Sequence, residues 1–184
     1  MQEELRVWGM ARLCAQLAVG LLAGACASPA PRPTGDHVGT APTHTPGAWR
    51  TLVREREGPP QPWAQMDTQM RKAHMTEAVM PAMLELFVAF DRTRYATFGC
   101  KTCHGAGART RDYAMPSPSL PILFPSGSRE QQQTVAENEE MARFMFNAVT
   151  PTMRALLGVA RYDKETGEGF SCFYCHPRGT PAEP

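Results

Sequence analysis

Two stretches of the sequence match without gaps: Met75-Thr-Glu-Ala-Val-Met-Pro-Ala-Met83 and, seventy residues later, Met145-Phe-Asn-Ala-Val-Thr-Pro-Thr-Met153. They share the pattern MxxAVxPxM, and a CxxCH motif follows each of them. The first motif begins seventeen residues after Met83, and the second begins nineteen residues after Met153. A pattern that recurs together with its motif indicates an internal repeat of one structural unit.

Each repeated unit is predicted to begin as a helix. Residues 69–90 are rich in Met, Ala, Leu and Glu, which are good helix formers. Pro81 and Pro151 fall inside the two helices. Proline lacks the amide hydrogen of a helix interior and clashes with the preceding turn, so each helix should kink there or restart with proline as its first residue. Thr150 is then a candidate cap for the second restart.

Each CxxCH motif offers two thiols and an imidazole within five residues. On a helical turn, residues three apart lie on one face. Both sulfurs can therefore form thioethers with one porphyrin edge while the next histidine binds the iron. The predicted cofactors are two covalently attached haem c groups. The attachment residues are Cys100, Cys103, Cys172 and Cys175, and the proximal iron ligands are His104 and His176.

Two other uses of CxxC pairs fit the sequence less well. A structural zinc site would have to combine both pairs, but 68 residues separate Cys103 from Cys172, more than zinc ribbons usually have. A thioredoxin-like redox pair would need a βαβ setting, which the sequence does not predict. Haem attachment is therefore the favoured interpretation.

The segments outside the repeated helices carry signals for a cap and for turns. Ser128 with Gln131 predicts a capping box that opens the second helical region. Residues 105–127 contain Met-Pro-Ser-Pro-Ser-Leu-Pro-Ile-Leu-Phe-Pro, which favours neither a helix nor a central strand. We expect this segment to wrap a haem face as irregular chain. The run from Asp163 to Gly169 should be a surface turn.

The stretch Met153-Arg-Ala-Leu-Leu-Gly-Val, followed by Glu168-Gly-Phe-Ser-Cys172-Phe-Tyr-Cys-His176, resembles the repeat of the tetrahaem cytochrome subunit of photosynthetic reaction centres. In that family a helix bearing a methionine ligand precedes most CxxCH helices, and the N-terminus is often lipid-anchored. The resemblance covers about half of the chain and implies a multihaem c-type cytochrome. The chain departs from the family by having two haem motifs and longer Met-to-Cys spacings, so no role in photosynthesis is implied.

The sixth iron ligands must lie upstream for the second haem, because no histidine or methionine follows His176. Met153 and Met83 are the preferred ligands, since each follows the helix-breaking proline and lies nearest its own motif, as the reaction-centre repeat implies. The remaining candidates stay open. For the first haem they are Met75, Met115 and His74, and for the second they are Met141 and Met145.

Aromatic and basic residues surround the predicted sites along the chain. We expect the aromatic side chains to form a shell around both porphyrins, which would replace most of the side-chain core in so small a domain. These residues are Phe87, Phe90, Tyr95, Phe98, Tyr113, Phe144, Phe146, Phe170 and Tyr174. Five arginines are candidate partners of haem propionates. They are Arg92, Arg94, Arg109, Arg111 and Arg161.

The N-terminal region predicts export. Residues 1–27 carry Arg6 and Arg12 ahead of an apolar stretch that is too short for a permanent membrane span, as in a cleaved signal peptide. Met10 is a plausible true start. Cleavage after Ala27 would release a soluble protein, whereas acylation of Cys26 would make a lipoprotein with a possible membrane anchor.

The mature protein is predicted to consist of a tether and one domain. Residues 28–63 are rich in Pro, Gly and Thr and should form an extended linker. Residues 64–184 should fold as an all-α, small dihaem cytochrome c domain, built from two repeated helix–CxxCH units with long irregular loops. A net charge of +1 gives no global field that would favour nucleic acid as a partner.

The predicted function is single-electron transfer by an exported c-type cytochrome, in the periplasm or on the outer face of a membrane, between redox protein partners. The protein would then be a carrier and not an enzyme. Two alternatives remain. One is a dihaem peroxidase-like or reductase enzyme with one open coordination position, for which His74 is the candidate distal residue. The other is a docking subunit of a membrane electron-transfer complex.

Overall fold

The computed structural model describes residues 46–182, and every structural statement below refers to that range. The predicted signal peptide (1–27), the alternative start at Met10, the acylation site Cys26 and the first part of the linker (28–45) lie outside the described residues.

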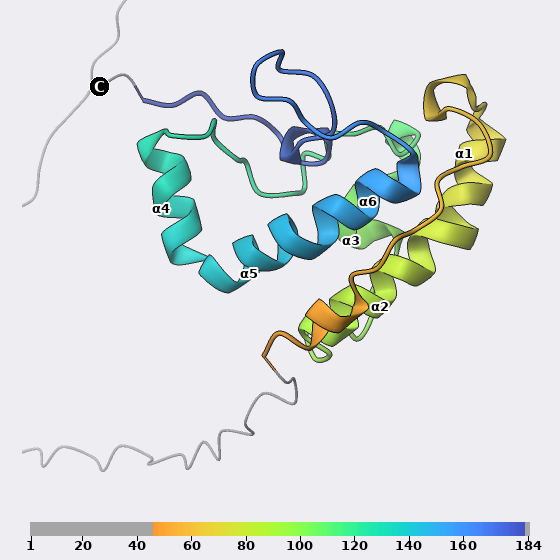
Figure 1. Ribbon diagram of the computed structural model, residues 1–184, viewed down its shortest axis with the longest axis horizontal. Coiled ribbons are helices and arrows are strands. Elements are labelled where there is room, and N and C mark those ends of the chain that lie inside the picture. Colours follow the sequence, from red (N-terminus) through yellow and green to blue (C-terminus); the bar gives the residue numbers. More distant parts are fainter. Residues whose placement is uncertain (1–45, 183–184) are drawn as a thin grey trace, which may run out of the picture. The chain divides into compact units, whose positions relative to one another are not determined.

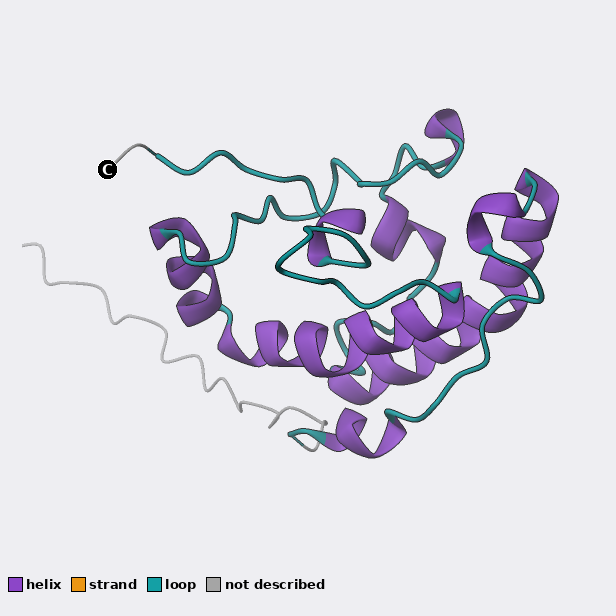
Figure 2. Cartoon of the chain, turned by 45° about the horizontal axis from the view of Figure 1, so that its top comes forward, coloured by secondary structure: helices purple, strands orange, loops and turns teal. Residues whose placement is uncertain are grey.

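Two long helical stretches form the centre of the described domain (Figures 1 and 2). The first consists of α1 (Thr68–His74), the π-helical turn η3 (Met75–Val79) and α2 (Met80–Phe90). The second consists of α5 (Glu139–Phe144), the π-helical turn η5 (Met145–Val149) and α6 (Thr150–Leu157). Residues 46–182 contain no β-strand, only two isolated bridges. The predicted all-α class is confirmed for this range.

The helical stretches accommodate their prolines through the π-helical turns. Pro81 and Pro151 are each the second residue of the α-helix that follows the turn. The wide turn closes with a bond from the Met80 amide to the Met75 carbonyl, and its counterpart runs from Thr150 to Met145. This shift in register absorbs the missing proline amide without ending the helix. Each α-helix continues from its π-helical turn without a break, so the predicted restart with proline as the first residue is wrong.

Thr150 does not cap the restarted helix, so that prediction is wrong. Its backbone is helical, with φ −60° and ψ −51°, and no side-chain cap is formed there. Because the chain passes from η5 into α6 without leaving the helix, no free helix N-terminus exists for Thr150 to cap.

The remaining described helices are short. They are η1 (Ala48–Leu52), η2 (Trp63–Gln65), α3 (Cys100–His104), η4 (Arg109–Arg111), α4 (Arg129–Glu137) and η6 (Cys172–Tyr174). The predicted cap of α4 is confirmed, since Ser128 Oγ accepts a hydrogen bond from the Gln131 amide at 3.2 Å. The Gln131 side chain reaches the Gly127 amide instead of the Ser128 amide that a capping box would use.

The two loops behave largely as the sequence predicts. Residues 105–127 are irregular apart from η4 and one bridge residue, Leu123. The Gly167 amide donates to the Asp163 carbonyl at 2.9 Å, which closes the predicted surface turn.

The two helical stretches pack against each other in a reciprocal way. The helix α2 contacts η5, and α6 contacts η3. Phe144 is fully buried at the crossing and stacks on Phe90 at 4.3 Å between ring centroids. Small side chains such as Ala82 and Ala148 are also buried in this core, which allows a close approach of the backbones.

The stretch Thr68–Phe90 is the one described helix that is long and apolar enough to cross a membrane, judged by length and composition alone. It also supplies much of the domain core, including Val79, Met83 and Leu86. A core helix of this kind passes the same test, so we draw no membrane assignment from it.

The predicted linker needs a correction in its described part. Residues 47–62 run beside α2 (Figure 1), and η1 contacts that helix. Trp49 is 3% exposed and packs edge-on against Phe144 at 5.5 Å. Arg54 and Arg56 both donate to Glu85 of α2, at 3.0 and 3.1 Å. The segment has few apolar residues, so its composition did not predict that the Trp49 ring packs in the core.

The predicted aromatic shell also needs a correction. Five of its members pack on one another in the helical core, so they form an ordinary side-chain core. They are Phe87, Phe90, Tyr95, Phe98 and Phe144. The other members lie elsewhere: Tyr113 contacts His104, Phe170 contacts Tyr174, and Phe146 is 69% exposed.

Candidate functional site

The first CxxCH motif forms the short helix α3. The Thr102 amide donates to the Gly99 carbonyl at 2.8 Å, and the Thr102 hydroxyl accepts from the Gly99 amide at 3.1 Å. This closed turn fixes the start of the helix. Cys100 and Cys103 lie three residues apart on it, so their thiols share one face, as thioether attachment requires.

His104 is the half-buried residue at the end of α3. Its Nδ1 atom is buried without a hydrogen-bond partner, and its ring packs edge-on against Tyr113 at 5.4 Å. Burial lowers the pKa of the imidazole, the Tyr113 backbone carbonyl opposes this shift, and the Arg111 charge adds to it. A neutral imidazole is the form that binds a metal.

Arg111 holds the backbone of the first motif. Its Nη2 atom donates to the His104 carbonyl at 2.6 Å, and Nη1 donates to the Ala114 carbonyl at 3.0 Å. The guanidinium therefore lies against the peptide of the predicted iron ligand, although the sequence suggested a propionate partner. The sequence repeat did not predict this contact, because the second unit has no residue that corresponds to Arg111.

Gly105 follows the first motif at a position where the chain is crowded. Its φ is +77°, and a Cβ built on it would lie 2.1 Å from Ser119 Oγ and 2.5 Å from Ser119 Cβ. Only glycine fits such a contact without moving the neighbouring chain. Residues 117–119 therefore pass directly beside the first motif.

The second CxxCH motif also forms one helical turn. It starts as η6, and the His176 amide donates to the Cys172 carbonyl at 2.9 Å. His176 Nδ1 lies 3.0 Å from the Pro121 carbonyl, to which it donates. Iron-binding histidines commonly make such a bond, which fixes the ring and leaves Nε2 free for the metal.

One loop, residues 117–123, contacts both CxxCH motifs. Besides its contact with Gly105, it receives the His176 hydrogen bond at Pro121. The Ser117 amide donates to the Cys175 carbonyl at 3.0 Å, and the Leu123 amide donates to the Pro177 carbonyl at 2.9 Å. The irregular segment predicted to wrap a haem face thus lies between the two CxxCH turns.

The thiols of Cys103 and Cys175 are close enough to interact electrostatically. Burial raises the pKa of the Cys103 thiol to about 12, and the Cys175 and Cys100 thiols add to the shift. Burial likewise raises the pKa of Cys175 to about 11, with a further contribution from Cys172. A reactive cysteine needs a lowered pKa, so these thiols do not resemble a thioredoxin-type pair.

The residues of each motif fit a covalently attached haem. Two thiols on one helical turn precede an imidazole, one imidazole has a buried unpartnered nitrogen, and the other is oriented by a carbonyl. Tyr174, within the second motif, and Ile122, next to Pro121, are large side chains that are exposed. In residues 46–182 the four cysteines are unpaired, and no group of three or more His, Cys, Asp or Glu could hold a metal ion. The zinc alternative gains no support from this part of the chain.

The preferred sixth ligands lie on the helical core. Met83 of α2 is 3% exposed among core side chains, and Met153 of α6 is partly buried against the same core. Met75, Met141 and Met145 are partly buried there too. The ligand roles of Met83 and Met153 stay a prediction.

His74 has a structural contact of its own. Its Nε2 atom lies 2.6 Å from the Leu156 carbonyl of α6, and its ring contacts Trp63. The side chain therefore links the first helical stretch to the end of the second. This contact engages one of the two ring nitrogens, Nε2, in a structural hydrogen bond.

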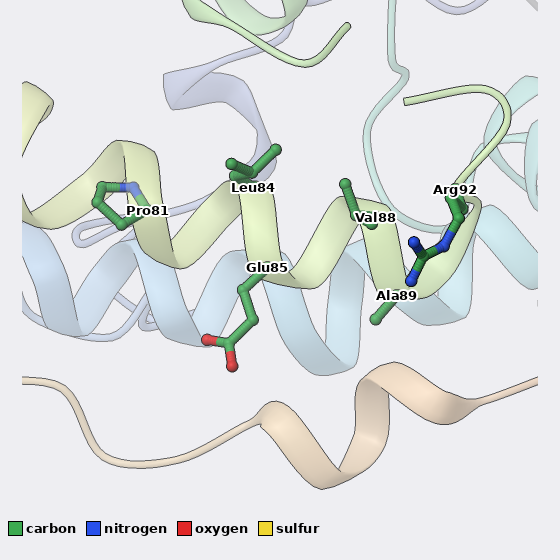
Figure 3. A pocket seen from close by; sticks show the side chains of 6 residues that line it. All are labelled: Pro81, Leu84, Glu85, Val88, Ala89 and Arg92. Atoms are coloured by element: carbon green, nitrogen blue, oxygen red, sulfur yellow. The ribbon is translucent and has the colours of Figure 1, made fainter. Parts of the chain in front are cut away.

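A shallow groove runs along the outer face of α2 (Figure 3). It encloses about 480 Å³ and is lined by Pro81, Leu84, Glu85, Val88, Ala89 and Arg92. Of the predicted site residues, Arg92, a candidate propionate partner, lies in it, and the predicted attachment residues and iron ligands do not.

Comparisons of the chain with protein-family models, with curated proteins and with solved structures found no match. The functional argument therefore rests on the residues and geometry of this chain. Sequence analysis alone missed Arg111 as a backbone partner of His104, Pro121 as the partner of His176, and Ser119 as the neighbour of Gly105. The one sequence signal for any of these contacts was Gly105, the glycine directly after the first motif.

Proposed function

We propose that the chain is an exported dihaem c-type cytochrome that transfers single electrons between redox protein partners. The observation that carries this proposal is the pair of CxxCH turns held by one loop, with His176 oriented by the Pro121 carbonyl at 3.0 Å. The same five-residue pattern occurs twice, and both copies adopt the helical turn that haem attachment needs.

The chain's own residues would hold and tune the haems. Cys100 and Cys103 would attach the first haem through thioethers, with His104 as proximal ligand. Cys172, Cys175 and His176 would do the same for the second. When bound, haem supplies the one-electron Fe(II)/Fe(III) couple. The loop 117–123 would keep the two sites at a fixed separation, which single-electron transfer between them requires.

The internal repeat receives support from the helical core. Each helical stretch contains a π-helical turn at the MxxAV segment and a proline two residues beyond it. The seventy-residue offset relates the contact of α2 with η5 to the contact of α6 with η3. This reciprocal correspondence is what two related units packed face to face would produce.

The remaining parts of the proposal follow the sequence. Met83 and Met153 are proposed as sixth ligands, and lipid attachment at Cys26 is proposed as the route to a membrane surface. Such an anchor is consistent with location in the periplasm or on the outer face of a membrane. It is also consistent with assembly into a larger electron-transfer complex. We do not propose the enzyme alternative, because the Leu156 carbonyl engages its candidate distal residue His74.

The test is a visible spectrum of the full chain, produced in a host that exports and matures c-type cytochromes. Two haems per chain that are reversibly reduced, with c-type absorption bands and low-spin iron, are expected. A folded protein with zinc and no haem would overturn the proposal. A high-spin, five-coordinate haem that turns over peroxide would replace it with the enzyme alternative.

A further inference from the structure

The two proposed sites differ in how the protein surrounds the proximal histidine. His104 is half-buried, and its Nδ1 atom has no hydrogen-bond partner. His176 Nδ1 donates to the Pro121 carbonyl at 3.0 Å. A hydrogen bond of this kind makes an imidazole a stronger electron donor to iron, which stabilises the ferric state. At the first site Nδ1 makes no such bond, and the Tyr113 backbone carbonyl, which also acts on the His104 imidazole, is only a weaker counterpart.

The charges near the two sites differ as well. The Arg111 guanidinium lies against the His104 peptide, with Nη2 at 2.6 Å from its carbonyl oxygen. Near the second motif, Arg178 is exposed and lies over the Phe173 ring at 4.4 Å. A fixed cation in a partly buried position disfavours the ferric state, which carries one more positive charge than the ferrous state. An exposed cation is screened by water.

We propose that Arg111 makes the haem at Cys100–His104 the higher-potential member of the pair. The inference rests on the proposed function and goes beyond it by ordering the two sites. The missing Nδ1 hydrogen bond and the Arg111 charge act in the same direction at the first site. The first electron taken up by the protein therefore resides at the iron bound to His104.

The test is an equilibrium redox titration of the full-length dihaem protein, followed by its absorption spectrum. Arg111→Gln removes the charge and should shift the upper of the two waves downward, with the lower wave unchanged. Arg111→Lys keeps the charge and should restore most of the shift, which a purely structural role of the guanidinium would not predict. Arg129→Gln is the control, because Arg129 is an exposed arginine at the start of α4 and is not among the predicted propionate partners.

The outcomes separate this inference from the proposed function. A protein without haem would overturn both. A dihaem protein in which Arg111→Gln shifts neither wave, shifts the lower wave, or behaves as Arg129→Gln does would overturn this inference alone. If Arg111→Gln yields no folded protein, the order is tested with single-haem variants. The Cys172→Ala, Cys175→Ala variant should titrate at a higher potential than the Cys100→Ala, Cys103→Ala variant, and the reverse order would contradict the proposal.

Discussion

The two helical stretches of the domain resemble each other closely, whereas the two CxxCH sites that follow them do not. Both stretches place a π-helical turn before a proline and contribute to one core. The first motif is an α-helical turn followed by Gly105 and held by Arg111. The second is a 3₁₀ turn followed by Pro177, with His176 bonded to Pro121. The two helical stretches thus share one backbone pattern, whereas local loops give each CxxCH motif its own surroundings.

The largest expected effect is the loss of one haem at a time. The Cys100→Ala, Cys103→Ala variant should leave a chain with haem only at the second site, and the Cys172→Ala, Cys175→Ala variant should leave haem only at the first. Each variant removes both thioether bonds at its own site and none at the other. Haem staining of tryptic peptides checks this, and loss of both haems in either variant would show that the sites are not independent.

The shared core should respond strongly to a single truncation. Phe144 is fully buried and contacts Trp49, Phe87 and Phe90. Phe144→Ala should lower the free energy of unfolding by about 3–5 kcal/mol. Phe146→Ala, two residues away and 69% exposed, should change it by less than about 0.5 kcal/mol. Urea denaturation of both variants checks this, and equal costs would contradict the described core.

The glycines that flank the first motif should differ in their tolerance of a side chain. Gly105→Ala places a Cβ against Ser119 at a φ of +77° and should cost about 1–3 kcal/mol. Gly99→Ala meets no atom within 4 Å and has extended backbone, so it should cost less than about 1 kcal/mol. Thermal unfolding followed by circular dichroism compares the two. A tolerated Gly105→Ala would mean that the 117–119 segment does not pack against the first motif.

The smallest effect is expected from losing the hydrogen bond between His74 and the Leu156 carbonyl. His74→Ala removes the hydrogen bond to the Leu156 carbonyl and should cost about 1 kcal/mol. His74→Gln retains a donor and should cost less. The spectrum of both variants should match that of the wild type. A changed haem spectrum in His74→Ala would instead support His74 as a sixth ligand.

The sequence predicted the helical class, the Ser128 cap and the helical turns of both motifs. These features depend on local residue chemistry. It did not predict the π-helical turns, because the register shift that accommodates Pro81 follows from packing of the whole helix. It also placed Trp49 in a linker, since composition cannot show that one aromatic ring reaches the core. The contacts of Arg111 and Pro121 join segments whose proximity depends on the path of an irregular loop.

The most direct test of the central claim is the intact mass of the mature full-length protein under denaturing conditions. Thioether bonds survive denaturation, whereas bonds from histidine or methionine to iron do not. The account predicts a chain heavier by two haem groups, with no alkylatable thiol at Cys100, Cys103, Cys172 or Cys175. A mass equal to that of the polypeptide alone, with these four cysteines free to react, would contradict it.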